Sequence, residues 1–339
     1  MSKIPKVTVL LSVYNGEKYL KEAIDSILNQ TFKDFEFLII NDGSTDKSLQ
    51  IINSYTDRRI KLINNKINIG LQKNLHKGIN LAIGEYIARM DADDISLPER
   101  LKVQVEFMDK HPKIGICGTW VKKLGRSANF VSKYYSVPDE VKASLLFNTS
   151  LAHPSVFIRK KFFIKYNLNY NQELNESEDY DLWTRCIDFF PISNINKILL
   201  YYRYHMESKS QKGIIELKNN SAIIRIKQLR KLNILPNDDE LFLHQNFVPT
   251  DKNKRAEFIM LTEKWLLKII EANKENKYCT EDALKKIIAD RWLLICRNNN
   301  QLGLFLIKKF LLSPLTKNLD LKNNFFSLVK LFATSLFKK

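Results

Sequence analysis

Three aspartates crowd into the four residues Asp91-Ala92-Asp93-Asp94. Carboxylates this close repel one another, so the group destabilises a fold unless a cation neutralises it. In an extended chain alternate residues point the same way, which lets Asp91 and Asp93 face one ligand. Hard oxygen ligands from so few protein groups suit Mg²⁺ or Mn²⁺, completed by water and phosphate oxygens. A solvated acidic loop that caps the helix beginning near Pro98 is the alternative.

A second acidic pair, Glu178-Asp179, stands close to the aromatic residues Tyr180 and Trp183. The pair lies at the expected start of a helix, where the helix dipole stabilises negative charge. Capping explains one acid there, whereas two acids beside aromatic side chains that exclude water are what a general base requires. The residues alone leave open which of the two is the base, and capping stays the alternative.

Other polar residues carry weaker signals. Asp42-Gly43-Ser44 is most often a helix cap, and Asn68-Ile69-Gly70 is equally a turn. His205 follows an expected strand, and together with Arg203 it could close over a diphosphate and a metal, although a lone histidine is usually structural. His153-Pro154-Ser155 either helps to form an acceptor pocket or turns the chain.

Alternating strand-like and helix-like periods must position these groups. Short apolar runs rich in β-branched residues predict buried strands, and apolar residues three and four apart predict helices. Four βα units in succession indicate an α/β fold with a mostly parallel sheet and helices on both faces. Ligands bind at the carboxyl ends of such strands, where every unusual polar cluster of this region falls. The expected strands are 7–14, 35–40, 60–63 and 85–90, and the expected helices 17–29, 46–55, 71–82 and 99–110.

The composition is that of a globular protein with a sizeable core, because 45% of the 339 residues are hydrophobic and 27% are charged. The charge is unusual: 54 basic against 37 acidic residues give +17, and residues 216–339 hold 23 basic and 13 acidic residues. This excess predicts an anionic partner. Nucleic acid is not the expected one, since the chain lacks a helix-turn-helix, RNA-recognition or zinc-finger signature.

The sequence shows neither a membrane span nor a signal peptide, which predicts a cytoplasmic protein. No run approaches the ~18 consecutive apolar residues of a membrane span, and residues 1–6 lead into a strand instead of a signal peptide. The four cysteines lie far apart without a C-x-x-C pair, which suits a reduced compartment and offers no zinc site.

The pattern changes near residue 215, between an α/β domain, 1–215, and a helical region, 216–339. Residues 302–339 contain seven lysines and one acid, Asp320. Basic amphipathic helices of this kind lie on anionic membrane surfaces, which predicts a peripheral protein at the inner face of the cytoplasmic membrane. Packing against the first domain, or against a sister subunit in a homo-oligomer, is the alternative. The apolar face expected for the last helix comprises Phe325, Leu328, Val329, Phe332 and Leu336.

Six segments, in this order and spacing, closely resemble the motifs of family-2 glycosyltransferases. The resemblance covers residues 5–210 and implies a GT-A-type nucleotide-sugar-binding fold. Processive synthases of the family differ, because this chain lacks their membrane spans and their Gln-x-x-Arg-Trp motif, so a single transfer per encounter is expected. The segments are SVYN at Ser12–Asn15, DGSTD at Asp42–Asp46, the Asn68/Gly70/Asn74 pattern, GEYIARMDADD at Gly84–Asp94, SEDYDLW at Ser177–Trp183 and YRYH at Tyr201–His205.

The resemblance implies a role for each matched acid. Asp42 would contact a uracil-type base and Asp91 the ribose side of the donor. Asp93 would bind the metal that bridges the diphosphate. Asp179 would be the catalytic base, with Glu178 as the runner-up. The other implied positions are His205 as a metal or diphosphate ligand and, for the nucleotide sugar, Tyr14, Asn15, Asn68, Gly70, Asn74 and Arg89.

An inverting, metal-dependent glycosyltransferase is the function that the resemblance implies. It would move a hexose or N-acetylhexosamine from a nucleotide sugar, expected to be a UDP sugar, to a glycan or lipid-linked oligosaccharide. Bacterial lipooligosaccharide, O-antigen and capsule synthesis use relatives of this layout. A nucleotidyltransferase is the alternative enzyme, but Tyr14–Glu17 lacks its Gly-rich phosphate loop. A basic nucleic-acid-binding protein and an inactive, scaffolding relative are the non-enzymatic alternatives.

Overall fold

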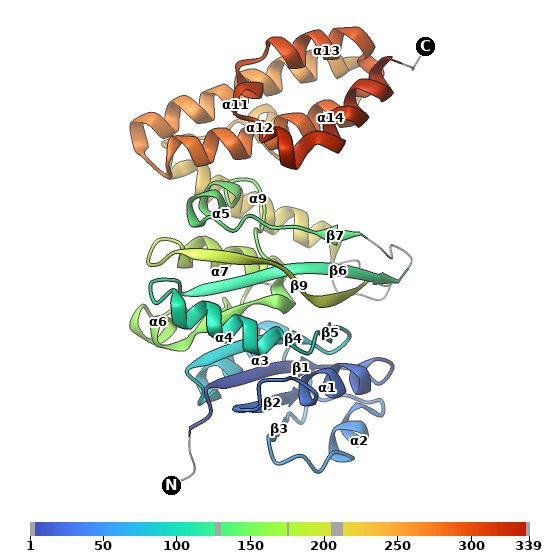
Figure 1. Cartoon of the computed structure of the whole chain (residues 1–339), viewed down its shortest axis with the longest axis vertical. Helices are drawn as coiled ribbons and strands as arrows, with labels where there is room; N and C mark the ends of the chain where they lie inside the picture. The colour runs from blue at the N-terminus through green and yellow to red at the C-terminus, as the bar shows by residue number, and fades with distance from the viewer. Residues whose placement is uncertain (1–3, 126–129, 175, 205–212, 337–339) are drawn as a thin grey trace. The chain divides into compact units, whose positions relative to one another are not determined.

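The chain divides into two compact units in a computed structural model that describes residues 4–125, 130–174, 176–204 and 213–336 (Figure 1). The first unit comprises Met1–Val141 with Thr149–Ser221, and the second comprises Lys142–Asn148 with Ala222–Lys339. The first contains the sheet and the second is helical.

One sheet runs through the first unit in the order β3-β2-β1-β4-β8-β6-β9-β5, with β7 paired to β6. The first four strands are parallel neighbours, β8 is antiparallel to both β4 and β6, and β6 and β9 form a further parallel pair. The expected α/β class with a mostly parallel sheet is therefore confirmed. The strands are β1 (Val7–Val13), β2 (Phe35–Asn41), β3 (Ile60–Asn64), β4 (Tyr86–Asp91), β5 (Ile95–Ser96), β6 (Ile116–Gly125), β7 (Val131–Ser132), β8 (Phe157–Arg159) and β9 (Ile192–Tyr204).

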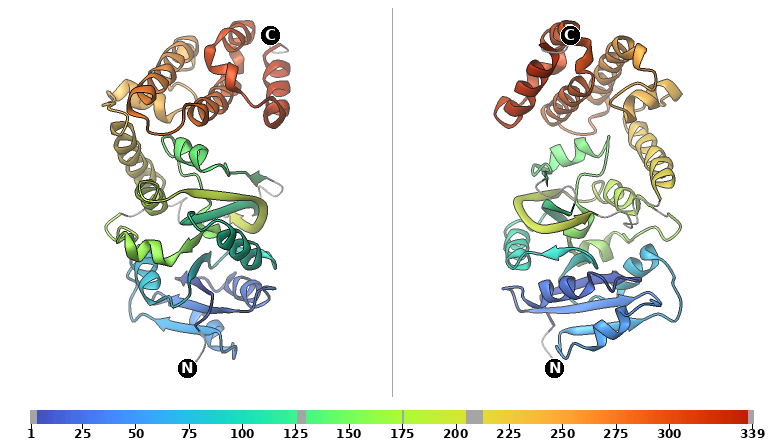
Figure 2. Two further views of the ribbon diagram at one scale, coloured as in Figure 1. Left: turned by 60° about the vertical axis from the view of Figure 1, so that its left-hand side comes forward. Right: turned by 90° about the vertical axis from the view of Figure 1, so that its right-hand side faces the viewer.

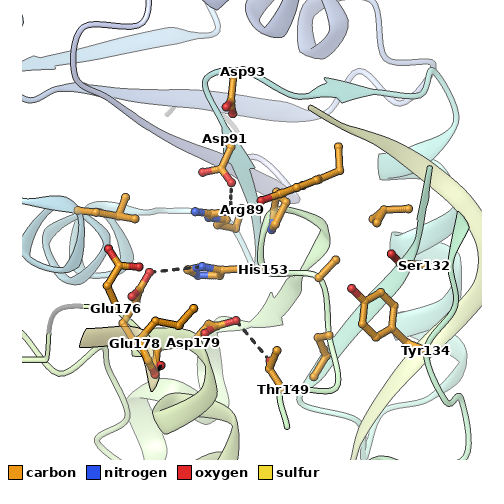
Figure 3. A pocket seen from close by; sticks show the side chains of 18 of the residues that line it. Arg89, Asp91, Asp93, Ser132, Tyr134, Thr149, His153, Glu176, Glu178 and Asp179 are labelled. Atoms are coloured by element: carbon orange, nitrogen blue, oxygen red, sulfur yellow. Dashed lines mark hydrogen bonds and ion pairs between the residues drawn. The ribbon is translucent and has the colours of Figure 1, made fainter. Parts of the chain in front are cut away.

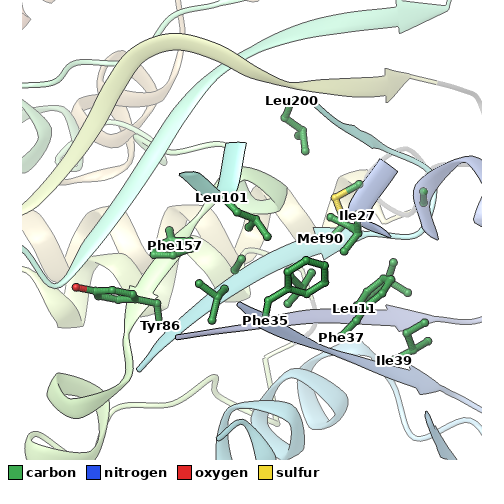
Figure 4. Close-up of a cluster of buried hydrophobic side chains, with 14 of the residues drawn as sticks. Leu11, Ile27, Phe35, Phe37, Ile39, Tyr86, Met90, Leu101, Phe157 and Leu200 are labelled. Carbon is green, nitrogen blue, oxygen red and sulfur yellow. The ribbon is translucent and has the colours of Figure 1, made fainter. Parts of the chain in front are cut away.

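Apolar side chains of neighbouring strands form the core beneath the helices. Leu11 of β1, Phe37 of β2 and Met90 of β4 belong to one buried cluster with Ile27 and Leu101, which come from two helices (Figure 4). Full burial of one such side chain stabilises the fold by about 1.5–3 kcal/mol. The helices of this part of the chain are α1 (Leu20–Leu28), α2 (Ser48–Asn53), α3 (Leu71–Leu81), α4 (Arg100–Lys110), α5 (Pro138–Ser144), α6 (Lys160–Lys165) and α7 (Glu178–Cys186), with a 3₁₀ turn at His153–Ser155.

The strand register brings polar strand ends to one edge of the sheet. Val13 is aligned with Asn41 on β2, and Ser12 with Asp91 on β4. Because these pairs are parallel, the loops that follow β1, β2 and β4 leave the sheet side by side. The sequence places three of its polar clusters in those loops.

Residues 142–148 belong to the helical unit, although the sequence analysis includes them in the first domain, and the division falls after Ser221 instead of near residue 215. The ring of Phe147 stacks on His244, with centroids 4.8 Å apart. His244 bonds through Nε2 to the carbonyl of Leu146 (2.9 Å), and Arg225 donates to the carbonyl of Phe147 (2.7 Å). The local sequence of residues 142–148 does not predict these contacts, because His244 and Arg225 lie far away in the sequence.

Helices α11 to α14 of the second unit pack against one another around buried residues such as Trp265 and Trp292 (Figures 1 and 2). Helix α10 was not expected from the sequence pattern, because with eight residues it is too short to show a clear apolar period. Asn237 and Glu240 form its capping box, with bonds of 2.8 and 3.1 Å. No described helix is both long and apolar enough to cross a bilayer. The helices are α9 (Ile214–Arg230), α10 (Asp238–Gln245), α11 (Arg255–Asn276), α12 (Glu281–Asn298), α13 (Gly303–Leu312) and α14 (Leu321–Leu336).

The contact between α3 and the sheet gives a stability test. A Cβ atom added at Gly78 would lie 2.3 Å from Cδ1 of Leu10, so Gly78→Ala should overpack this contact and lower the free energy of unfolding by about 1–3 kcal/mol. Lys73→Ala, at an exposed position of the same helix, should change it by less than about 0.5 kcal/mol. Urea unfolding of both variants measures the difference, and equal stabilities would contradict the packing described for α3.

Candidate active site

A pocket of about 450 Å³ lies beside the carboxyl end of β4. Arg89 and Asp91 line it from β4 and Asp93 from the turn that follows, while Glu178 and Asp179 line it from the start of α7. The two acidic groups lie on opposite sides of the pocket (Figure 3). Acids that are far apart in the sequence therefore converge on one cavity.

Buried Arg89 forms an ion pair with the half-buried Asp91 at the end of β4. Arg89 is 3% exposed, and its Nη1 donates to Oδ2 of Asp91 (2.5 Å). Burial raises the pKa of Asp91, and the Arg89 guanidinium opposes that rise. Nε of Arg89 is buried and has no hydrogen-bond partner among the described residues. The site thus retains a buried donor that an anionic ligand can satisfy.

The turn after β4 gathers three carboxylates. Oxygens of Asp91, Asp93 and Asp94 all lie within 4.8 Å of one another. Asp94 is 1% exposed; its Oδ1 accepts a bond from the backbone N–H of Arg203 (2.8 Å), and its Oδ2 has no partner among the described groups. Burial and the neighbouring acids raise the pKa of Asp94 well above its ordinary value. An orphaned carboxylate oxygen among hard ligands fits a divalent cation such as Mg²⁺ or Mn²⁺.

Arg203 supports this acidic turn. Its Nε donates to the carbonyl of Asp93 (2.8 Å), and its Nη2 pairs with Glu22 (2.7 Å). Two nitrogens of the guanidinium are therefore engaged by protein groups, and closure of Arg203 over a diphosphate stays a prediction. His205, the second metal ligand expected from the sequence, lies outside the described residues.

The two acids at the start of α7 have different surroundings. Glu178 is buried, and its carboxylate lies 3.7 Å from Nδ1 of His153 and 3.5 Å from Nε2 of Gln72. Asp179 accepts bonds from the hydroxyl of Thr149 (3.3 Å) and from the backbone N–H of Tyr180 (2.7 Å). Burial, and then the negative charge of Glu178, raise the pKa of Asp179 to about 7.

Asp42 ties the loop after β2 to the loop that precedes α3. It is 2% exposed and accepts bonds from the side chain of Asn65 (2.9 Å) and from the backbone N–H groups of Ile69 (2.9 Å) and Gly70 (3.0 Å). Burial raises the pKa of Asp42, but these bonds and Asn74 outweigh it and hold that pKa below its ordinary value. The structure thus brings Asp42, Gly70 and Asn74 together.

The loop after β1 is tied to the same region. Oδ1 of Asn15 accepts a bond from the backbone N–H of Thr45 (2.8 Å), and Tyr14 is 51% exposed. Oδ1 of Asn68 accepts a bond from the N–H of Gly70 (3.0 Å). Six of the residues expected to bind the nucleotide sugar follow the strand ends without lining the pocket of Figure 3: Tyr14, Asn15, Asp42, Asn68, Gly70 and Asn74.

One wall of the pocket is absent from the sequence expectations. Ser132 and Tyr134 line it at the right of Figure 3, and Thr149 lies between them and Asp179. Burial raises the pKa of Tyr134 to about 12, so its hydroxyl is neutral and can donate a hydrogen bond at neutral pH. Nothing in the local sequence of these residues marks them as functional.

Comparison with known proteins shows the family of this chain. The family model described as Glycosyl transferase family 2 matches residues 8–171. An uncharacterised glycosyltransferase of Methanocaldococcus jannaschii is 38% identical over 207 residues, which cover 59% of this chain and 71% of that protein. The O-antigen biosynthesis glycosyltransferase WbnJ of Escherichia coli is 33% identical over 216 residues, covering 61% and 83%.

The chain belongs to glycosyl transferase family 2. Solved structures share the fold of this glycosyltransferase at lower identity. S. aureus TarS in complex with UDP-GlcNAc has a TM-score of 0.55 at 19% identity, covering 95% of this chain and 91% of that one. The mannosyltransferase PcManGT from Pyrobaculum calidifontis, in complex with GDP-Man and Mn²⁺, has a TM-score of 0.52 at 14% identity, covering 97% and 87%.

The surroundings of Asp179 predict a pH-dependent stability. The pKa of Asp179 rises on folding from 3.8 to about 7. A raised acid pKa makes the folded protein less stable as the pH increases through that interval, because the folded state must release a proton that it holds more tightly. In Asp179→Asn the amide does not ionise, so the variant should gain roughly 1–3 kcal/mol relative to wild type between pH 5 and pH 8.

Urea unfolding at both pH values measures this gain, with Glu173→Gln as a control for the loss of one exposed acid. A stability difference between Asp179→Asn and wild type that is the same at both pH values would contradict a raised pKa for Asp179.

Proposed function

We propose that this glycosyltransferase transfers a hexose or N-acetylhexosamine from a UDP sugar to a sugar hydroxyl, with inversion at the anomeric carbon. The observation that carries the proposal is the position of Asp93 and Asp179 on opposite sides of one pocket (Figure 3). A transferase of this kind has to hold a leaving diphosphate on one side of the sugar and deprotonate an acceptor on the other.

A metal-dependent donor site is supported by the acidic turn. Asp93, with Asp91 and Asp94 beside it, would hold Mn²⁺ or Mg²⁺, and His205 stays a proposed ligand on the sequence resemblance. When bound, such an ion supplies Lewis-acid stabilisation of the negative charge on the leaving diphosphate. Arg89, with its unpartnered Nε, would bind the same anion. PcManGT, whose structure contains Mn²⁺, supports the choice of ion.

The nucleotide would bind along the strand ends beside the pocket. We propose that Asp42 contacts the base and Asp91 the ribose side, with Tyr14, Asn15 and Asn68 around them. The hydrogen bonds that tie these loops together would hold such a binding surface in place. The complex of TarS with UDP-GlcNAc supports a uridine donor.

Asp179 would be the base. With a pKa near 7 it is largely ionised at slightly alkaline pH, yet basic enough to accept a proton from an attacking hydroxyl. Glu178 would position it, because His153 and Gln72 approach the Glu178 carboxylate and its charge acts on Asp179. Direct attack by the acceptor oxygen, opposite the departing diphosphate, inverts the anomeric configuration.

The acceptor would bind on the wall formed by Ser132, Tyr134 and Thr149, near Asp179. Hydroxyl groups there can exchange hydrogen bonds with a sugar. WbnJ, named for O-antigen biosynthesis, supports a glycan precursor as the acceptor class. A lipid-linked precursor would require the enzyme to work at the inner face of the cytoplasmic membrane.

The donor and metal proposals are tested by UDP release from a panel of sugar nucleotides without an acceptor. UDP-GlcNAc, UDP-glucose and UDP-galactose are compared with GDP-mannose, each with Mn²⁺ and with EDTA. We expect slow hydrolysis of one UDP sugar, its loss in EDTA, and a decrease of about 100-fold or more in Asp93→Ala. Glu106→Gln, at an exposed position of α4, is the control. Turnover of GDP-mannose alone, or turnover that persists in EDTA, would contradict the proposal.

The assignment of the base is tested with Asp179→Asn and Glu178→Gln. Asp179→Asn should lower kcat for UDP release by about 10²–10⁴-fold and leave the Kd of the UDP sugar, measured by calorimetry, unchanged. Wild-type kcat/KM should increase as the pH rises through about 7, since the base acts when ionised.

Glu178→Gln removes a negative charge beside Asp179, so it should shift this limb of the pH profile to lower pH and retain activity. The reverse pattern, an inactive Glu178→Gln and an active Asp179→Asn, would make Glu178 the base.

A further inference from the structure

Helices α13 and α14 expose large apolar side chains to solvent. The rings of Phe310 and Phe332, with centroids 6.4 Å apart, join the two helices on their inner sides. The outward side chains are not singly scattered, as on an ordinary surface. Eight large apolar residues of these two helices are exposed: Leu304, Phe305, Leu311, Leu312, Leu321, Phe325, Phe326 and Val329.

The apolar face of α14 differs from the one expected from sequence. Leu331 is fully buried and Ser335 is 3% exposed, so this side faces the other helices. Leu328 and Phe332, expected on the outer face, are half-buried. Phe326 is 86% exposed, although it is not part of the expected face. The inner side of the helix is therefore buried against protein. Its outer side, which includes Phe325 and Phe326, exposes apolar side chains that another apolar environment would bury.

The charges around these side chains are mostly positive. Between residues 303 and 336 the sequence holds five lysines and one acid, the half-buried Asp320. Lys309 pairs with Glu263 of α11. Lys308 of α13, Lys322 and Lys330 of α14, and Lys317 of the turn between the two helices are exposed. Lys322 and Lys330 directly follow the exposed Leu321 and Val329 in the sequence. The outer side of the two helices is therefore apolar and cationic.

We infer that α13 and α14 bind an anionic phospholipid surface. The apolar side chains would enter the acyl boundary, while the long lysine stems let the ammonium groups reach the headgroups. Each lysine near such a surface strengthens binding. In a symmetric dimer, by contrast, the same patch meets itself, so lysines such as Lys322 and Lys330 would approach those of the partner copy without opposing acids.

This inference deepens the proposed function, because it names the surface at which a lipid-linked acceptor would be met. Its test reads lipid binding and not sugar transfer. Failure of the test therefore leaves the proposed chemistry standing, and a failed transferase assay leaves the lipid result standing.

The test is co-sedimentation of the full-length protein with vesicles of phosphatidylcholine alone and of phosphatidylcholine mixed equally with phosphatidylglycerol. Wild type should pellet with the mixed vesicles and much less with the neutral ones. Phe325→Ser/Phe326→Ser should weaken binding about tenfold or more, since both rings lose apolar burial in the membrane. Lys322→Glu/Lys330→Glu should weaken binding to the anionic vesicles about tenfold or more.

The matched control is Leu261→Ser/Lys264→Glu, an exposed apolar and basic pair on α11. It should bind as wild type does. All the substituted residues are exposed, and circular dichroism reports whether each variant is folded. Wild type that does not pellet with anionic vesicles, or α13–α14 variants that pellet like the control, would overturn the inference. So would a dimer in light scattering that the Phe325→Ser/Phe326→Ser variant converts to a monomer without any change in vesicle binding.

Discussion

The buried guanidinium of Arg89 is the interaction on which the site depends. It pairs with Asp91 (2.5 Å). Burial lowers the pKa of Arg89, but the charge of Asp91, with that of Glu178 among the others, holds this pKa above its ordinary value. Arg100, fully buried behind it, donates to the carbonyl of Arg89 (2.7 Å) and so fixes the end of β4. One cation cannot neutralise acids on both sides of the pocket. Burial, and then the negative charge of Glu178, raise the pKa of Asp179. Crowding of the acids makes the turn after β4 a place where a divalent ion would relieve repulsion.

Local sequence pattern predicted the first half of the fold well. Apolar runs such as 7–13 and 35–41 are buried strands of the parallel sheet. Short, nearly continuous apolar runs are typical of such strands, since both faces of a parallel sheet are covered. The second half was less predictable, because β6 and β9 pair across more than seventy residues and with a register shift near Trp120. Residues 142–148 show the same limit. They bond to His244 and Arg225, which lie far away in the sequence, so the local pattern does not predict this packing.

The candidate site, too, could be predicted only in part from the sequence. Spacing alone selected Asp91, Asp93, Glu178 and Asp179, since crowded acids are costly and therefore conspicuous. The sequence did not show that Asp94 is buried with one oxygen on the backbone N–H of Arg203 and the other without a partner among the described residues, because this depends on where β9 passes. The residue types alone also left open whether Glu178 or Asp179 is the base, and only the family resemblance favoured Asp179. His153 and Gln72, from two other parts of the chain, create the difference between them.

The two units separate two physical problems that a transferase for a lipid-linked acceptor must solve. The pocket has to stabilise charge as it develops, which requires buried polar groups and therefore costs stability. Apolar contact with a lipid would add nothing to that chemistry if it were built into the pocket. Placed on α13 and α14 instead, membrane binding would confine the enzyme to the surface that carries the acceptor and so raise the effective acceptor concentration. The acceptor wall around Tyr134 would then need only enough affinity to orient one hydroxyl toward Asp179.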